Sequence, residues 1–223
     1  MSARDAVLGK IRRSLGVTGE EPRRNAAVDE RLKRAPRGVI PARGQLGAEE
    51  RVSLFTTMAE KAAATVTRVA GEAAVPAEVA EYLRGRNLPA AVRIGEDMLL
   101  NGLDWRQTQV AVSHGASDGR DAVGVTHADA GVAESGTLVL ISGQDNPTTL
   151  NFLPDTSIVV VRAGDIAGDY ESVWAAIRAK FGKGVMPRTV NYVTGPSRSG
   201  DIEQTILLGA HGPRRLHIII VDG

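Results

Sequence analysis

The stretch Ser157-Ile158-Val159-Val160-Val161 decides the fold class of this chain. These residues are nearly all apolar, which predicts a strand buried on both faces, because a half-exposed strand would alternate apolar and polar residues. A second apolar run, Leu216-His217-Ile218-Ile219-Ile220-Val221, closes the chain. Strands of this kind are typical of a parallel sheet with helices on both faces.

Strand and helix patterns alternate on both sides of these runs. The predicted strands are residues 65–69, 90–94, 109–113, 123–126, 136–141, 157–161, 189–193 and 216–221. The predicted helices are residues 3–15, 48–64, 77–86 and 170–181, with Ser2 and Asp169 as caps and Pro76 at a favourable first position. Alternation with short connections predicts an α/β fold with a mainly parallel sheet and helices on both faces.

The N-terminal segment differs from the rest of the chain in composition. Residues 16–47 are rich in Arg, Pro and Gly without periodicity, which predicts an extended linker with at most one helical turn. We therefore divide the chain into an N-terminal helix with a basic linker, residues 1–47, and an α/β domain, residues 48–223. Residues 1–47 hold 11 Lys and Arg against 5 Asp and Glu, whereas residues 48–223 hold 16 against 21. Acids interrupt the basic residues, and no aromatic lies between them, which favours a solvated or docking segment over a nucleic-acid arm.

The composition excludes several kinds of chemistry. The chain has 223 residues, 43% of them hydrophobic, and no cysteine. It therefore has no thiol nucleophile, no disulfide, no Cys-ligated zinc and no Cys-held iron–sulfur cluster of its own. No apolar run is long enough to span a bilayer, and residues 1–5 do not begin a signal peptide. We expect a cytoplasmic protein without membrane insertion and without a cofactor in this chain.

Two Gly-Pro turns in the last quarter carry more polar groups than a connector requires. Strand 189–193 runs into Gly195-Pro196-Ser197-Arg198-Ser199-Gly200-Asp201-Ile202-Glu203, which predicts a tight turn that opens a short helix. Its hydroxyls, guanidinium and helix amides would suit an anionic ligand. Asp201 and Glu203 would repel a phosphate from the first helical turn, so the spacing alone favours a capped helix start. A second turn, Gly209-Ala210-His211-Gly212-Pro213-Arg214, follows.

A lone carboxylate, Glu134, lies in Ala133-Glu134-Ser135-Gly136-Thr137, at the start of an apolar strand. Burial would raise its pKa and suit it to act as a general base or nucleophile. The other interpretation is a carboxylate that hydrogen-bonds the turn built by Ser135 and Gly136, and the residues alone favour this second role.

The remaining polar segments are less specific. The loop Gly143–Pro154 fits a ligand-closing loop and a plain surface loop about equally. His127 and Asp129 form a His-x-Asp pair, while His217 lies inside an apolar strand and is predicted to be structural. A metal site requires ligands from separate elements, and we expect none.

Four blocks in the same order resemble the LUD domain of the lactate utilization protein C family. They are Ala133–Thr137, Leu150–Pro154, Gly195–Glu203 and Gly209–Arg214, and the resemblance covers the body from about residue 48 to the end. Gly200 and Asn151-Phe152 depart from the usual family residues. The resemblance implies a fold like those of ribose-5-phosphate isomerase, glucosamine-6-phosphate deaminase and the CoA transferases. It also implies a role in oxidising L-lactate to pyruvate, alongside partner proteins that carry iron–sulfur clusters.

The leading functional hypothesis is a subunit or accessory protein of an L-lactate utilization system that has no redox centre of its own. It would bind a small anionic ligand or a partner through Ser135, Gly136, Thr137, Gly195, Ser197, Arg198, Ser199, Asp201, Glu203, His211 and Arg214. The alternative is an independent enzyme of the same fold that acts on an acyl-CoA or a sugar phosphate, with Glu134 as base or nucleophile. A third hypothesis is a scaffold whose motifs only cap and turn the backbone.

Overall fold

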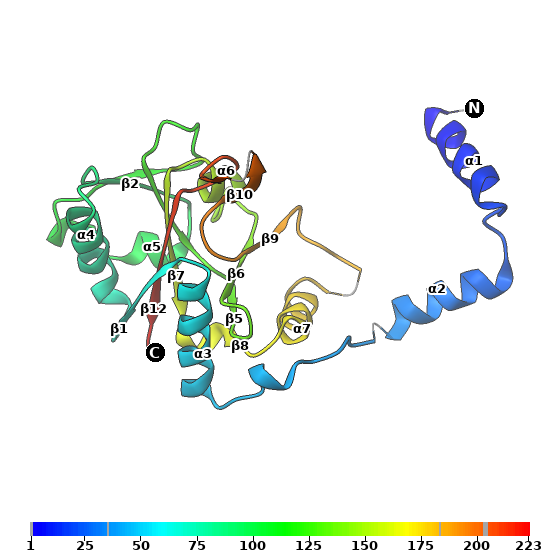
Figure 1. The fold of residues 1–223 in the computed structure, drawn as a ribbon, viewed down its shortest axis with the longest axis horizontal. Coiled ribbons are helices and arrows are strands. Elements are labelled where there is room, and N and C mark those ends of the chain that lie inside the picture. The colour runs from blue at the N-terminus through cyan, green and yellow to red at the C-terminus, as the bar shows by residue number, and fades with distance from the viewer. Residues whose placement is uncertain (1, 35, 183, 203–204) are drawn as a thin grey trace. The chain divides into compact units, whose positions relative to one another are not determined.

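A computed structural model describes residues 2–34, 36–182, 184–202 and 205–223. The chain divides into two compact units, Met1–Val39 and Ile40–Gly223 (Figure 1). The first unit contains α1 (Ala3–Leu15) and α2 (Pro22–Arg34), and neither helix buries a side chain. The predicted first helix is confirmed, but α2 forms where the sequence predicts an extended linker. Pro22 suits the first turn of a helix, because that turn leaves its amides unpaired in any case.

The second unit is built on a six-stranded sheet in which every neighbouring pair is parallel. The strand order is β1-β12-β7-β4-β2-β3. The strands are β1 (Thr65–Val69), β2 (Ala91–Ile94), β3 (Ala111–His114), β4 (Val123–His127), β7 (Thr156–Arg162) and β12 (Arg215–Val221). The predicted α/β fold is therefore confirmed, and each of these strands matches a predicted one.

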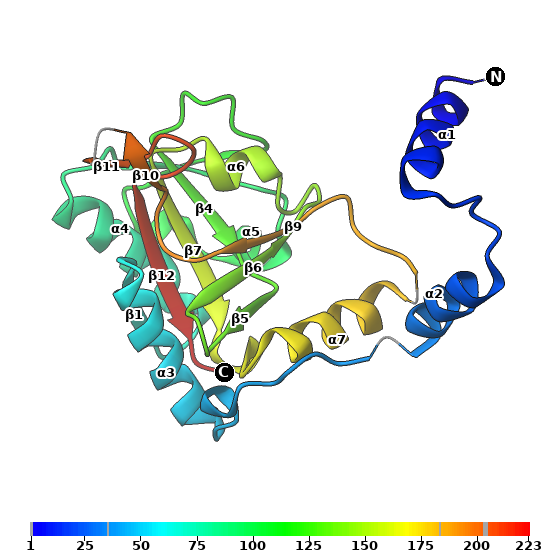
Figure 2. The ribbon, with the colours of Figure 1, turned by 45° about the vertical axis from the view of Figure 1, so that its right-hand side comes forward.

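A smaller mixed sheet, which is not predicted from the sequence, packs on one face of the parallel sheet (Figure 2). Its order is β8 (Ile166–Ala167), β5 (Ala130–Val132), β6 (Thr137–Ile141) and β9 (Val190–Val193). The α-helices of this unit are α3 (Ala48–Lys61), α4 (Val75–Gly85), α5 (Met98–Gly102), α6 (Thr148–Phe152) and α7 (Tyr170–Phe181). Short 3₁₀ turns cover Ala42–Gly44, Glu72–Ala74, Trp105–Gln107 and Ala163–Asp165.

The pleat of β7 shows why its sequence is continuously apolar. Ile158 and Val160 point into a core formed with α4 and α5, whereas Val159 and Val161 point into a core formed with α3 and the smaller sheet. All four side chains are fully buried. The far side of the smaller sheet is covered by α7. The helices therefore lie on both faces of the parallel sheet, as predicted.

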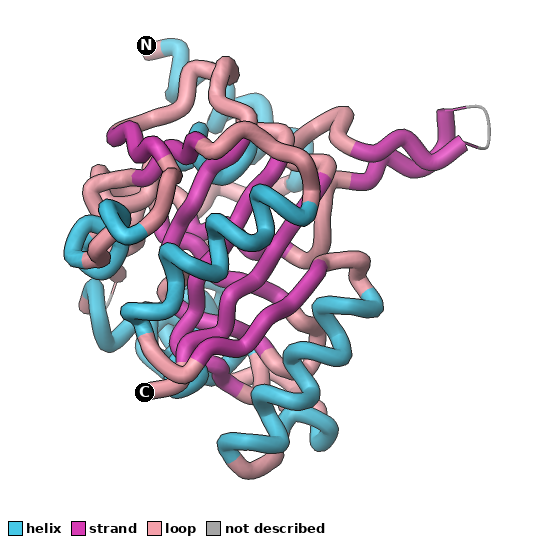
Figure 3. Tube along the Cα trace, turned by 90° about the vertical axis from the view of Figure 1, so that its left-hand side faces the viewer, coloured by secondary structure: helices cyan, strands magenta, loops and turns pink. Residues whose placement is uncertain are grey.

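The segment after Pro196 forms a hairpin in place of the predicted helix. β10 (Arg198–Ile202) and β11 (Thr205–Leu208) are antiparallel and pair only with each other among the described strands. The hairpin extends from the end of the α/β unit (Figure 3). Ser, Gly and the β-branched residues of this stretch are poor helix formers, and Thr and Ile suit a strand. The helix prediction is wrong, so no helix N-terminus is present to attract an anion there.

Candidate functional site

The two C-terminal turns meet around a cavity of about 410 Å³. The cavity is lined by Gly195, Ser197, Arg198 and His211 from the sequence-predicted residues, and by Phe152 from the Leu150–Pro154 block. The remaining lining residues are Ala62, Tyr192, Val193, Thr194, Pro196, Gly212 and Pro213. Three of the four sequence blocks are thus brought to one place, although Phe152 and Pro213 are 61 residues apart along the chain.

Ser197 joins the two turns. Its amide donates to the carbonyl of Pro213 at 2.8 Å, and its carbonyl accepts from the amide of Gly209 at 3.0 Å. Its hydroxyl accepts from the amide of His211 at 3.3 Å. Because these hydrogen bonds are directional and join the two turns, they hold the backbone that lines the cavity in place before any ligand binds.

Gly195 and Arg198 anchor the same turn to the end of α3. Gly195 has a φ of 70°, and a Cβ at this position would come within 2.1 Å of the carbonyl oxygen of Ala62. The Arg198 guanidinium donates to that same carbonyl oxygen at 3.4 Å. The side chains of Arg198 and His211 are exposed, and none of the described lining residues is Asp or Glu. The cavity therefore presents positive charge without a compensating carboxylate.

The cavity lies at the amino edge of the parallel sheet, because Pro213 precedes β12 and Phe152 precedes β7. Ligand sites of open α/β sheets are instead typical of the carboxyl edge. β9, which leads into the first turn, belongs to the smaller sheet. The sequence predicts a turn from a strand of the parallel sheet into a helix. This prediction is wrong twice, because the strand before the turn belongs to the smaller sheet and the segment after it is a hairpin.

Arg214, Ser135, Gly136 and Thr137 are not among the described lining residues of the cavity. Ser199 and Asp201 lie on β10, and Glu203 lies outside the described residues. The Nε of Arg214 is 3.7 Å from Oδ1 of Asp155, and the Arg214 side chain packs against Gly209.

Glu134 is located at the turn between β5 and β6, and its residue is only 4% exposed. Its Oε1 accepts from the amide of Tyr170 at 3.4 Å, in the first turn of α7, where a carboxylate is favoured by the helix dipole. Its Oε2 is 3.9 Å from Nε of Arg43. Glu134 is not among the cavity-lining residues. These contacts hold the turn against α7. The carboxylate thus bonds to Tyr170 and Arg43, whereas the residues alone favoured a bond to the turn of Ser135 and Gly136.

A cluster of four hydroxyl groups connects the Glu134 turn to the cavity. Thr137 Oγ1 lies 2.8 Å from Ser135 Oγ, 2.9 Å from the Tyr170 hydroxyl and 2.6 Å from Thr194 Oγ1. Ser135 Oγ is also 2.9 Å from the Tyr170 hydroxyl. Thr194 in turn lines the cavity. Ser135 and Thr137 are predicted from the sequence, whereas Thr194 and Tyr170 are not. A hydroxyl residue directly before a Gly-Pro turn was a usable signal for Thr194.

Replacing Thr137 with valine is expected to lower the free energy of unfolding by about 1–3 kcal/mol, since Thr137 is fully buried and its partners would lose their shared hydroxyl. Urea unfolding followed by circular dichroism measures this change. Thr57→Val, on the exposed side of α3, is the control and should have an effect of at most about 0.5 kcal/mol. An equal effect of both variants would mean that the hydroxyl cluster contributes no stability.

The histidine predictions have mixed outcomes. His127 bonds to Asp97 and not to Asp129, whose carboxylate is held by Lys180 and the amide of Ile141. His217 is buried and stacks on Tyr82, as a structural residue would. Within the described ranges, no three His, Asp or Glu side chains are arranged to hold a metal ion. No helix in the described part of the chain is long and apolar enough to cross a bilayer.

Comparison with curated proteins connects the chain to lactate utilization. It is 40% identical over 100 residues to lactate utilization protein C of Geobacillus sp. (strain WCH70), a match that covers 44% of this chain and 42% of that protein. The values for the proteins of the same name from Bacillus licheniformis and Bacillus subtilis (strain 168) are 41% and 39% over 101 residues, covering 45% of this chain and 42% of each relative. The matching stretch thus spans less than half the length of these relatives.

A solved structure shows a similar fold. The crystal structure of a DUF162 family protein from Deinococcus radiodurans superposes with a TM-score of 0.60 over 79% of this chain and 99% of that chain, at 24% sequence identity. The model of the LUD domain matches residues 52–221, which include every strand of both sheets and the whole cavity. The chain therefore belongs to the LUD domain family and is a relative of lactate utilization protein C.

Proposed function

We propose that this chain is a subunit or accessory protein of an L-lactate utilization system and binds a small anion in the cavity between the two C-terminal turns. It has no cysteine to hold a redox cluster, so the electron-transfer centres would belong to iron–sulfur partner proteins in the cytoplasm. The observation that carries the anion proposal is the cavity itself. Arg198 and His211 line it together with the Ser197 hydroxyl, and no carboxylate stands among its described lining residues.

The charge and geometry of the cavity favour a carboxylate or phosphate ligand. A guanidinium offers several donors in one plane and pairs well with such groups. Thr194 and Ser197 also line the cavity, and a hydroxyl group can donate a further hydrogen bond. The turn is already held in place by backbone bonds, which reduces the ordering cost of binding.

Arg198→Gln is expected to weaken anion binding about tenfold, since it removes the guanidinium from the cavity. His211→Gln is expected to weaken it as well, since it removes the imidazole ring from the same cavity. Isothermal titration calorimetry with L-lactate and with inorganic phosphate, on the full chain, measures the change. Arg84→Gln is a matched control, because Arg84 is an exposed arginine of α4 that pairs with Glu81 and lies outside this cavity. Unchanged binding in both cavity variants, or no binding of either anion, would remove the cavity as an anion site.

The role in lactate utilization is tested separately. Affinity purification of the tagged chain from lactate-grown cells should recover iron–sulfur proteins, and deletion of the gene should impair growth on L-lactate but not on glucose. Normal growth on lactate together with an absence of iron–sulfur partners would contradict this part of the proposal, whatever the cavity binds.

A further inference from the structure

A second polar site lies at the opposite edge of the parallel sheet, where the strand order reverses. β2 continues through α5 to β3, whereas its neighbour β4 continues through β5 and β6 to β7 on the other side. Ligands of open α/β sheets bind outside the carboxyl ends of two such strands. His127 is the last residue of β4, and Asp97 follows β2 by three residues. Both side chains therefore lie where the topology favours a ligand.

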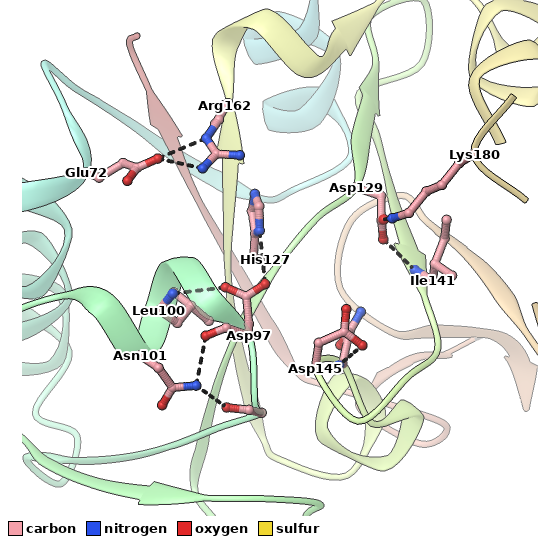
Figure 4. Close-up of polar contacts among 12 residues, drawn as sticks. Glu72, Asp97, Leu100, Asn101, His127, Asp129, Ile141, Asp145, Arg162 and Lys180 are labelled. Atoms are coloured by element: carbon pink, nitrogen blue, oxygen red, sulfur yellow. Dashed lines mark hydrogen bonds and ion pairs between the residues drawn. The ribbon is translucent and has the colours of Figure 1, made fainter.

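Asp97 holds the His127 ring in a defined orientation (Figure 4). Its Oδ2 is 3.2 Å from Nδ1 of His127, and its Oδ1 accepts from the amide of Leu100 at 2.9 Å. Burial raises the pKa of Asp97, but hydrogen bonds from His127 and Leu100 outweigh it, so the pKa is lowered and the carboxylate stays ionised. An ionised Asp97 accepts a hydrogen bond from Nδ1–H, and in the tautomer with its proton on Nδ1 the Nε2 atom is an acceptor.

The Nε2 atom of His127 is buried and has no hydrogen-bond partner in the described part of the chain. Buried polar atoms of this kind are normally paired, and leaving one unpaired is unfavourable. Nearby, the buried amide of Asn146, on the loop that packs against Gly95 beside Asp97, also has no partner for either polar atom. A ligand with a hydroxyl group would supply the donor that Nε2 lacks.

Arg162 supplies a positive charge on the same side of the sheet. His127 is the register partner of Val160 in β7, and residues two apart on a strand share a face, so Arg162 emerges on the face of His127. In the view of Figure 4, the His127 ring lies between Asp97 and the pair formed by Arg162 and Glu72. In that pair, Nε and Nη2 of Arg162 donate to Oε1 of Glu72 at 2.9 and 2.8 Å. The side chains of both residues are over 40% exposed. An exposed pair of this kind is weak and can be exchanged for a ligand carboxylate.

We propose that His127 and Arg162 bind a small 2-hydroxycarboxylate, with the ligand hydroxyl donating to Nε2 of His127 and the ligand carboxylate pairing with the Arg162 guanidinium. Asp97 is a positioning residue that fixes the tautomer of His127. The site is separate from the cavity at Ser197, and only the choice of L-lactate as the first probe rests on the proposed function.

Nuclear magnetic resonance of the full chain with ¹⁵N-labelled histidine tests this site. Addition of L-lactate should shift the ring nitrogens of His127, and propionate, which lacks the hydroxyl, should bind about tenfold more weakly. His127→Gln should weaken lactate binding at least about tenfold, whereas His114→Gln, an exposed histidine at the same edge, should not. Asp97→Asn should change the His127 tautomer in the free protein and weaken binding as well. Arg162→Lys tests the carboxylate contact if the His127 variant fails to fold.

The outcomes separate this site from the cavity. Lactate-induced shifts of the His127 ring nitrogens that are lost in Arg162→Lys but kept in Arg198→Gln support the site described here, whatever the cavity binds. Binding that depends on Arg198 and His211 but not on His127 would overturn it and leave the proposed function intact. Unmoved His127 resonances at saturating lactate, or an Arg162→Lys variant that binds like the original chain, would also overturn it.

Discussion

Gly136→Ala is expected to lower the free energy of unfolding by about 3–5 kcal/mol, a large part of the stability of an ordinary domain. Gly136 has a φ of 65°, a left-handed conformation that side chains rarely adopt. A Cβ would also come within 2.2 Å of the amide nitrogen of Ala59, in the backbone of α3. Because backbone cannot rotate away as a side chain can, the β5–β6 turn and α3 would have to separate. Urea unfolding followed by circular dichroism measures the loss.

Two control variants divide this effect into its causes. Gly119 also has a positive φ, of 90°, but a Cβ there would meet nothing within 4 Å, so Gly119→Ala should have only the conformational cost of about 1 kcal/mol. Gly71 is extended and equally open, so Gly71→Ala should change stability by less than about 0.5 kcal/mol. If Gly136→Ala lowers the free energy of unfolding no more than Gly119→Ala does, the close packing of the turn on α3 does not contribute to the loss.

Acid is expected to destabilise the protein through His217. Burial lowers the pKa of His217 to about 4, well below its ordinary value of 6.5. The unfolded chain therefore takes up a proton at a higher pH than the folded chain does. The stabilising contribution is complete above pH 6.5, is lost as the pH falls from about 6.5 to 4, and amounts to about 3 kcal/mol. Oε1 of Glu78, 3.6 Å from Nε2, favours the charged ring and limits the loss, whereas Arg86 opposes that charge.

The His217→Phe variant isolates this contribution. Phenylalanine keeps the stacking on Tyr82, whose ring centroid is 4.1 Å from that of His217, but cannot take up a proton. The free energy of unfolding of this variant should fall less between pH 7 and pH 4 than that of the original chain. The lost hydrogen bond to Thr65 lowers it by the same amount at every pH. His114→Gln is the exposed control and should keep the original pH profile. Parallel profiles for all three proteins would exclude His217 as the source of acid sensitivity.

The boundaries of most helices and strands follow from local patterns. The predicted strand 65–69 matches β1 at both ends, and the helix that Asp169 caps begins at Tyr170. These predictions succeed because a capping side chain or an apolar period acts over a few residues. The stretch after Pro196 fails for the opposite reason. Its first residues are typical of a helix start, but its β-branched residues lie in two strands that pair with each other. Local periodicity does not show which segments pair.

The candidate site, too, is predicted in part from local sequence and decided in part by the order of the strands. The four blocks, two of them Gly-Pro turns with Ser, Arg or His, are evident from the residues, and three of the blocks do line one cavity. That the cavity lies at the amino edge of the sheet follows only from strand order, since β9 was expected in the parallel sheet and pairs instead with β6.

The hydrogen-bond partner of His127 shows most clearly what the sequence alone does not determine. Its neighbour in sequence, Asp129, bonds to Lys180, whereas Asp97, 30 residues away, bonds to its ring. Residue type and periodicity were sufficient for the run Ser157–Val161, because a strand buried on both faces needs apolar side chains at every position whatever its neighbours are. Which polar groups meet at the strand ends depends on the order of the strands, and the order is set by long-range packing of both faces of the sheet.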